Sequence, residues 1–235
     1  MLCAVVGFGL FITGAPGRSS SELGIDQWLS LRHTPLLNSI ALAIAWLFDP
    51  PMAVALTIAS AALVALITRN PARVLTFLGI IAVAWGGSAV LKVIVQRPRP
   101  DAALLAHPLL AENSFSYPSG HTCFIAALSL AVIFLFRDHP RRRAIVVAAG
   151  LATLLVGVSR VYLGVHYPTD VIASIVYSAA AAVLALVVWL NHVLPHLPTR
   201  FSMKQPVVRL DLGPHDLEGR ASDDRNEATP ASHRR

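Results

Sequence analysis

Long apolar runs without a charged residue constrain this chain more than any other feature of its sequence. Five segments of 16 to 29 residues contain no Asp, Glu, Lys or Arg, namely 50–68, 74–91, 113–136, 144–159 and 171–199. A helix that crosses the hydrocarbon core of a bilayer needs about 20 apolar residues, because its backbone hydrogen bonds must close within the segment. We therefore predict that these five segments are transmembrane helices.

The first 50 residues contain two shorter apolar segments. Residues 1–17 lack the basic flank of a signal peptide, so we interpret them as a first membrane span. Residues 36–48 are only 13, which suits a helix at the membrane face better than a crossing. The predicted fold is all-α: a multi-pass membrane protein built as a helical bundle of about six transmembrane helices, with an interfacial helix after the first.

The composition excludes a soluble globular protein and divides the chain into two parts. Hydrophobic residues make up 55% of the sequence and charged residues only 14%, whereas a soluble domain carries about 25% charged residues. From about residue 198 the sequence becomes polar and mixed in charge, and it cannot bury a core. We therefore expect a transmembrane domain over residues 1–198 and a flexible tail over residues 199–235.

Basic residues in two short loops predict the orientation of the chain. These loops contain Arg69, Arg73, Arg137, Arg141, Arg142 and Arg143. The positive-inside rule assigns both loops, and with them the tail, to the cytoplasm. Residues 92–120 and 160–170 then share the opposite side. Four basic residues on that side break the rule and need another explanation: Lys92, Arg97, Arg99 and Arg160.

The first polar motif on this outer side follows the predicted span 74–91. It reads Lys92-Val-Ile-Val-Gln-Arg-Pro-Arg99-Pro100. Lys92 and Arg99 leave two cations near one helix end, and the two prolines stop the helix and stiffen the loop. Taken alone, the motif is equally compatible with basic side chains that extend toward the membrane interface.

The second motif, Tyr117-Pro-Ser119-Gly120-His121-Thr122, opens the predicted span that ends at residue 136. Pro, Ser and Gly at a helix start leave backbone N–H groups unpaired at the positive end of the helix dipole. Such an end binds anions, and Gly120 has no side chain that would keep a ligand away. His121 could then pass a proton to or from the bound group. The alternative is a capped helix with an incidental interfacial histidine.

The third motif, Ser159-Arg160-Val-Tyr-Leu-Gly-Val-His166-Tyr-Pro-Thr-Asp170, joins the last two predicted spans. Four residues separate His166 from Asp170, so the carboxylate can reach one imidazole nitrogen. A carboxylate in this position fixes the tautomer of the ring and raises its basicity, which makes His166 a candidate nucleophile. A structural hydrogen bond that closes the loop is the alternative.

Together the three motifs indicate phosphoryl transfer. Two histidines, one carboxylate and several cations converge on one membrane face, without the cysteine or acidic clusters of a metal site. Phosphoryl transfer without a metal needs cations and backbone donors around the phosphate oxygens, a group that attacks, and a group that protonates the leaving oxygen. We accordingly predict no metal and no cofactor.

The motifs Lys-x6-Arg-Pro, Pro-Ser-Gly-His and Ser-Arg-x5-His-x3-Asp, in this order, resemble the signature of the type 2 phosphatidic acid phosphatase superfamily. This superfamily includes lipid phosphate phosphatases and vanadium haloperoxidases. The motif resemblance covers residues 92–170, and the arrangement of spans extends it over most of residues 1–195. The tail lies outside it, and the short first span departs from the pattern.

The resemblance implies a role for each matching position. His166 would form a phosphohistidine, Asp170 would orient it, and His121 would protonate the leaving group and then activate water. The phosphate would be held by Lys92, Arg99, Ser119, Gly120 and Arg160. Arg97 is not a signature position and remains a loop cation or a second contact.

The resemblance also implies a function and a location. We expect a lipid phosphatase in the plasma (inner) membrane, with its site facing the periplasm or exterior and its tail in the cytoplasm. The implied substrates are undecaprenyl or another polyprenyl diphosphate, which we rank first, phosphatidate, and phosphatidylglycerophosphate. Membrane lipids are the expected surroundings, with no nucleic acid and no protein partner. A vanadium-dependent haloperoxidase and a non-enzymatic lipid or anion carrier are the alternatives.

Overall fold

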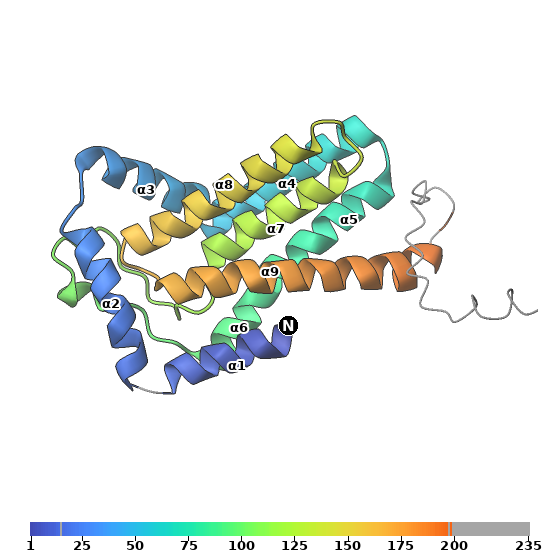
Figure 1. The fold of residues 1–235 in the computed structure, drawn as a ribbon. Coiled ribbons are helices and arrows are strands. Elements are labelled where there is room, and N and C mark those ends of the chain that lie inside the picture. The colour runs from blue at the N-terminus through green and yellow to red at the C-terminus, as the bar shows by residue number, and fades with distance from the viewer. Residues whose placement is uncertain (15, 197, 199–235) are drawn as a thin grey trace, which may run out of the picture. The chain divides into compact units, whose positions relative to one another are not determined.

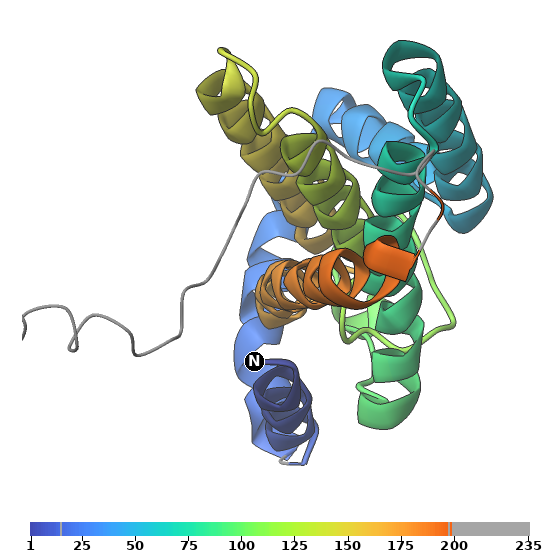
Figure 2. The ribbon, with the colours of Figure 1, turned by 90° about the vertical axis from the view of Figure 1, so that its right-hand side faces the viewer.

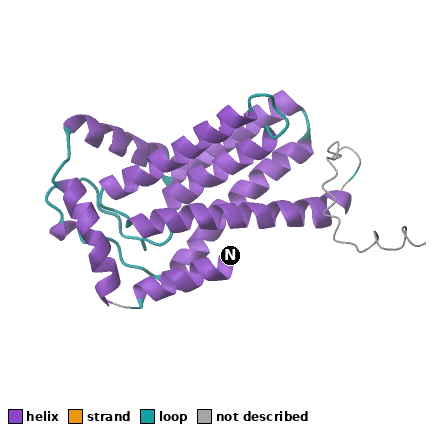
Figure 3. Ribbon diagram, in the orientation of Figure 1, coloured by secondary structure: helices purple, strands orange, loops and turns teal. Residues whose placement is uncertain are grey.

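The computed structural model describes residues 1–14, 16–196 and 198, and every regular element within them is a helix (Figure 3). The α-helices are α1 (Leu2–Thr13), α2 (Pro16–Ser30), α3 (Pro35–Leu47), α4 (Pro50–Thr68), α5 (Pro71–Ile81), α6 (Gly87–Val95), α7 (Gly120–Leu135), α8 (Arg142–Tyr162) and α9 (Pro168–Val188). Two π-helical turns, Ala82–Gly86 and Trp189–Val193, follow α5 and α9. Short 3-10 turns occupy Ala102–Leu104 and Leu194–His196. The predicted tail, 199–235, lies outside the described residues.

Four helical stretches are long and apolar enough to cross a membrane: Pro50–Thr68, Pro71–Val95, Arg142–Tyr162 and Pro168–His196. Leu2–Thr13 and Gly17–Ser30 meet at 88° and would form a fifth span only as a bent pair. The predicted all-helical, multi-pass fold is confirmed. Two of the six predicted spans, 1–17 and 113–136, contain helices of only 12 and 16 residues, and the interfacial segment 36–48 forms the 13-residue α3.

The short length of α7 has a local cause. The helix begins at Gly120 because Ser119 caps it, with its Oγ accepting a hydrogen bond from the N–H of Thr122 over 3.4 Å. Residues 113–119 are uncharged but irregular, so they extend the loop that begins after α6. This loop passes the ends of α7, α8 and α9 and contributes side chains to the candidate site.

The buried core of the bundle surrounds α7, which packs against α5, α8 and α9. Its buried face carries small side chains such as Ala127 and Ala131, which let neighbouring helices approach closely. In Figure 2, α9 is seen end-on, with the yellow-green α7 and α8 on one side and the teal α5 on the other. Large apolar side chains on the outer helices are exposed, as expected where lipid replaces water: Leu66, Leu155 and Val183 are examples.

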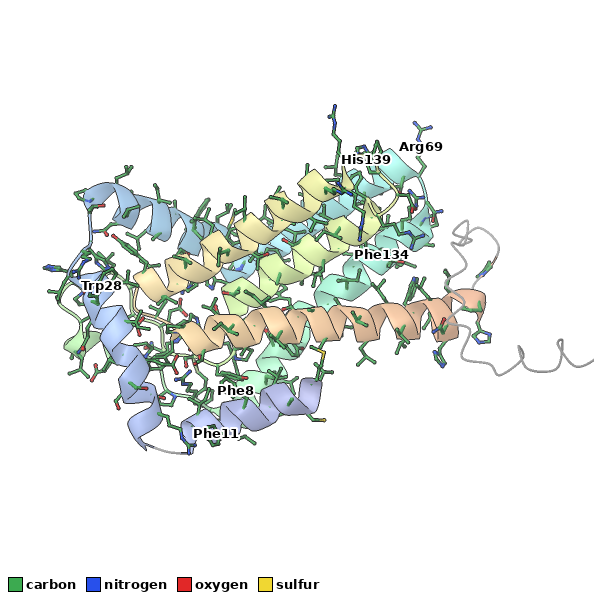
Figure 4. The ribbon with its side chains drawn as sticks, viewed as in Figure 1. Phe8, Phe11, Trp28, Arg69, Phe134 and His139 are labelled. Atoms are coloured by element: carbon green, nitrogen blue, oxygen red, sulfur yellow. The ribbon has the colours of Figure 1, made fainter. Side chains whose placement is uncertain are left out.

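The two ends of the bundle differ in chemistry. Figure 4 shows Arg69 and His139 at one end, where the six arginines lie in the α4–α5 and α7–α8 connections or in the first turns of α5 and α8, and Trp28 of α2 at the opposite end. At this second end α8 stops and α7 and α9 begin, close to α2 and α3 (Figure 1). Gly164 adopts φ of +66°, which permits the tight turn between α8 and His166. All three polar motifs therefore meet at the end away from the arginine loops.

Candidate active site

A cavity of about 280 Å³ opens among these helix ends. Five of the eight predicted site residues line it, namely Lys92, Arg99, Gly120, His121 and His166. The other lining residues are Phe48, Asp49, Pro50, Trp85, Glu112, Asn113 and Ser114. The remaining three predicted residues, Ser119, Arg160 and Asp170, are fully buried and are not among its lining residues. A second cavity of about 320 Å³ between α5 and α9 has no titratable lining residue and offers no group for chemistry.

Arg99 contacts the candidate nucleophile directly. Its NH1 lies 3.0 Å from Nε2 of His166 and donates to the carbonyl oxygen of Val165 over 2.7 Å. Its Nε and NH2 donate to the backbone oxygen and Oγ of Ser114 over 2.7 and 2.8 Å. Its NH2 also pairs with a carboxylate oxygen of Glu112, so all five N–H donors of Arg99 have partners, and a phosphate must take over one of these contacts.

Glu112 joins two of the cations. One carboxylate oxygen lies 2.6 Å from NH2 of Arg99, and the other pairs with NH2 of Arg160. Burial alone would raise the pKa of Glu112, but Arg160 and Arg99 outweigh this effect and hold the pKa below its ordinary value. Arg160 is fully buried, and its Nε and NH1 have no partner among the described residues. These donors remain available to an anion.

The start of α7 faces the same cavity. The N–H of Ser119 donates to Oγ of Ser174 over 2.8 Å, and the Ser119 hydroxyl caps the helix, so both groups are already used. The N–H groups of Gly120 and His121 have no hydrogen-bond partner within the described part of the chain. Lys92 reaches across from α6, and its Nζ donates to the carbonyl oxygen of Phe115. The helix end thus combines unpaired donors with a nearby cation, as an anion site requires.

His166 is buried between Arg99 and Asp170. Arginine can only donate, so the imidazole accepts at Nε2 and carries its proton on Nδ1. Nδ1 faces Oδ2 of Asp170 at 3.5 Å, which is longer than an ordinary hydrogen bond, and it has no other partner among the described residues. The expected contact between the two side chains is therefore present as a close approach.

The surroundings of His166 keep its imidazole neutral. Burial lowers the pKa of His166 well below its ordinary value, and the positive charges of Arg99, Arg160 and Lys92 lower it further. A neutral imidazole has a lone pair on Nε2, the nitrogen that points toward the cations. This is the protonation state that a nucleophile needs.

His121 is held by a helix that the motifs do not include. Its Nε2 lies 3.0 Å from the carbonyl oxygen of Ala45 in α3. A carbonyl can only accept, so Nε2 carries a proton and Nδ1 is the nitrogen that can exchange one with a ligand. The predicted interfacial segment therefore contributes to the site through Ala45, and through Phe48 at its end.

The structure gives a place to two further residues that are not signature positions, Glu112 and Arg97. Glu112 lies in a loop with no recognisable pattern, and only its isolation as the single acidic residue between Asp101 and Asp138 sets it apart. Arg97 does not line the cavity; its NH1 donates to Oδ1 of Asp170 over 2.7 Å. Within the described residues, no group of three or more His, Cys, Asp and Glu side chains could hold a metal ion.

Comparison of the sequence with known families gives one family and several relatives. The sequence model of the PAP2 superfamily matches residues 73–194. Phosphatidylglycerophosphatase B of Bacillus subtilis is 41% identical over 88 residues, which are 35% of this chain and 41% of the relative. Undecaprenyl-diphosphatase BcrC of Bacillus subtilis is 35% identical over 88 residues, 37% of this chain and 42% of the relative. The matches span about two fifths of the length of these curated relatives.

The fold is also similar to that of a solved structure. This is a transmembrane PAP2 type phosphatidylglycerolphosphate phosphatase from Bacillus subtilis, with a TM-score of 0.67 and 27% sequence identity. The similarity covers 79% of this chain and 94% of that chain. It therefore includes most of the helices described above, and extends beyond the residues that the superfamily matches.

Proposed function

Because the chain belongs to the PAP2 superfamily, we propose that it is a membrane phosphatase that hydrolyses a lipid phosphate or diphosphate through a phosphohistidine on His166. The family expected from the three motifs is thereby confirmed. The observation that carries the proposal is the contact between Arg99 and Nε2 of His166, at the wall of a cavity that Lys92 also lines. A neutral nucleophile beside fixed cations is the arrangement that attack on a phosphate requires.

The first proposed step transfers the phosphoryl group to the enzyme. Nε2 of His166 attacks phosphorus while the bond from phosphorus to the leaving oxygen breaks, and that oxygen takes a proton from Nδ1 of His121, which gains this proton when the anionic phosphate binds beside it. Asp170 stabilises the imidazole through its Nδ1 proton as positive charge develops on the ring. Lys92, Arg99 and Arg160, with the N–H groups of α7, neutralise the charge on the three non-bridging oxygens.

The second step releases phosphate and restores the enzyme. His121, now neutral, removes a proton from a water molecule whose oxygen attacks the phosphohistidine. The bond from phosphorus to nitrogen breaks, and its electron pair returns to Nε2 of His166. A positioned acid and base of this kind contributes about 100- to 10,000-fold to the rate.

We place the site on the outer face of the plasma (inner) membrane, toward the periplasm or exterior. The arginine-rich helix connections around Arg69 and His139 lie at the end of the bundle away from the cavity, which supports this orientation by the positive-inside rule. The lipid part of the substrate would lie in the bilayer beside the helices while its phosphate enters the cavity. For the substrate we favour a polyprenyl diphosphate, with phosphatidylglycerophosphate and phosphatidate as alternatives. Relatives named for the first two are among those reported above.

Phosphate release from a panel of these lipid phosphates by the purified protein tests the proposal. The wild-type protein is expected to release phosphate with and without a chelator. His166→Ala should abolish release and His121→Ala should nearly do so, while both variants stay folded in detergent. Full activity of His166→Ala would exclude it as the nucleophile, and loss of wild-type activity with the chelator would contradict a metal-free mechanism. Lipid movement without phosphate release would favour a carrier.

A further inference from the structure

Arg97 uses all of its hydrogen-bond donors inside the protein. An arginine has five N–H groups, and Arg97 makes five hydrogen bonds of 2.7 to 3.2 Å to the side chains of Ser19, Glu22, Thr169 and Asp170. Its side chain is fully buried. No donor is left for a substrate, in contrast to Arg160, which keeps two unpartnered nitrogens. Because Arg97, unlike Arg99, also lies outside the cavity lining, it is not a second phosphate contact.

Glu22 connects this arginine to the start of α9. One carboxylate oxygen lies 2.9 Å from NH2 of Arg97, and the other accepts from the N–H of Thr169 over 3.0 Å. The Thr169 hydroxyl also lies within 2.8 Å of both oxygens. A carboxylate at a helix N-terminus satisfies unpaired N–H groups and interacts favourably with the helix dipole. Glu22 thereby fixes the first turn of α9, which contains Asp170.

The same network sets the rotation of the Asp170 carboxylate. Oδ1 accepts from Arg97 over 2.7 Å, and Oδ2 accepts from the N–H of Tyr167 over 3.0 Å. With both oxygens held, Oδ2 is the one that faces Nδ1 of His166. Without Arg97, a fully buried carboxylate oxygen would lose its charged partner, at a cost that favours another rotamer or a neutral acid.

We propose that Glu22 and Arg97 are positioning residues that act through Asp170 on His166, so that α2 is part of the catalytic unit. Glu22 and Ser19 lie outside residues 73–194, which the superfamily matches. The inference rests on the proposed function, since it assigns to His166 the role of nucleophile. A positioning role differs from a purely structural one, because the effect of Arg97 on catalysis must then pass through the carboxylate of Asp170.

Kinetics of single and double variants test this dependence. Arg97→Gln is expected to lower kcat about 100-fold, which is the usual cost of a small misplacement of the reacting groups. The KM for the lipid phosphate should stay within about 3-fold of wild type. Arg97→Lys, which keeps the charge, should recover part of this loss, and the conservative Glu22→Gln should lower kcat by a smaller factor. In an Asp170→Asn background, Arg97→Gln should cause little further loss, because the two residues act as one unit. Arg32→Gln, an exposed arginine on the ring of Trp28, is the matched control and should retain full activity.

A spectroscopic measurement separates this proposal from the proposed function. In ¹⁵N-histidine spectra of the purified full chain, the His166 resonances are assigned by their loss in His166→Gln. Wild type should show the tautomer with the proton on Nδ1, and the Nδ1 resonance should shift in Arg97→Gln and Glu22→Gln but not in Arg32→Gln. Unchanged His166 resonances in folded variants, or additive losses of kcat in the double variant, would overturn the proposal. Absence of phosphate release by wild type would refute the proposed function alone, because the resonances still decide on the positioning role.

Discussion

NH1 of Arg99 lies 3.0 Å from Nε2 of His166, so a proposed phosphate ligand and the proposed nucleophile are in direct contact. The nucleophile needs the lone pair that this hydrogen bond occupies. A phosphate oxygen that takes over the NH1 donor frees the lone pair and, in the same movement, brings phosphorus toward Nε2. Binding of the substrate and release of the nucleophile are then coupled through one guanidinium group.

Arg99→Lys should lower kcat/KM about 100-fold. A lysine keeps the positive charge but loses the planar fork that bonds Ser114, Val165 and His166 together, and loss of one donor to a transition-state oxyanion costs about 100- to 1,000-fold. Steady-state phosphate release measures the effect. Arg73→Lys, in the first turn of α5 at the other end of the bundle, is the control. Equal values of kcat/KM for Arg99→Lys and wild type would contradict the coupling.

The neutral state of His166 predicts the pH dependence of its phosphorylation. Burial and the nearby cations lower its pKa well below the ordinary value of about 6.5, so the imidazole stays neutral as the pH falls from 7 to 6. The rate of phosphohistidine formation in a single turnover should show no loss from protonation of His166 over this range. An Arg99→Met variant removes one cation that lowers this pKa, so its acid limb should move to higher pH. A fall of this rate in wild type with an apparent pKa near 6.5 would contradict the prediction.

The same shift has a consequence for stability. Below about pH 6.5 the imidazole of the unfolded chain takes up a proton, while the folded protein keeps His166 neutral. The unfolded state then binds more protons, so the contribution of His166 makes the free energy of unfolding fall as the pH falls below this value. Thermal unfolding in detergent should show a smaller loss of Tm between pH 7 and 5.5 in His166→Gln than in wild type. An equal loss in both would contradict the assignment.

Glu112→Gln should strengthen inhibition by inorganic phosphate about 10-fold or more. The carboxylate neutralises part of the charge of Arg99 and Arg160 and uses one donor of each. A carboxylate within about 4 Å of a bound phosphate would repel it by several kcal/mol even with partial screening. A glutamine keeps the size of the side chain and removes the charge. The inhibition constant for phosphate measures the effect, with Asp101→Asn, outside the cavity lining, as the control. Unchanged or weaker inhibition would show that Glu112 does not compete with phosphate.

Helix starts were predictable wherever a residue type fixes the backbone locally. Ser119 caps α7 as its motif indicates, and α3 occupies Pro35–Leu47, within one residue of the apolar run 36–48. The lengths of the spans were less predictable, because absence of charge does not distinguish lipid from the interior of the protein. The loop 113–119 is uncharged without being a span, whereas α8 continues through Arg160 because that arginine is buried.

The site was predictable where sequence neighbours share a helix end, and not where contacts join distant segments. The four-residue spacing of His166 and Asp170 brings their side chains together as expected. The contact of Arg97 with Glu22 joins residues 75 positions apart, and that of Arg160 with Glu112 joins residues 48 apart. Nothing in the local sequence specifies either pair, because each depends on how α2 and the loop after α6 pack against the ends of α8 and α9.

Gly164→Ala tests the turn that presents His166. A residue with a side chain is strained by about 1 to 2 kcal/mol at the φ of +66° that Gly164 adopts, and the new Cβ would also collide with the buried side chain of Leu105. We therefore expect a fall in the free energy of unfolding of at least that size, together with a lower kcat, because the turn lies two residues from the nucleophile.

Gly150→Ala is the matched control: its Cβ would meet nothing within 4 Å, and alanine in a helix interior stabilises by about 0.5 to 1 kcal/mol. Tm and the rate of phosphate release should therefore both fall in Gly164→Ala, whereas Gly150→Ala should keep the wild-type rate with an equal or higher Tm. A fully active and equally stable Gly164→Ala would mean that this turn does not set the position of His166.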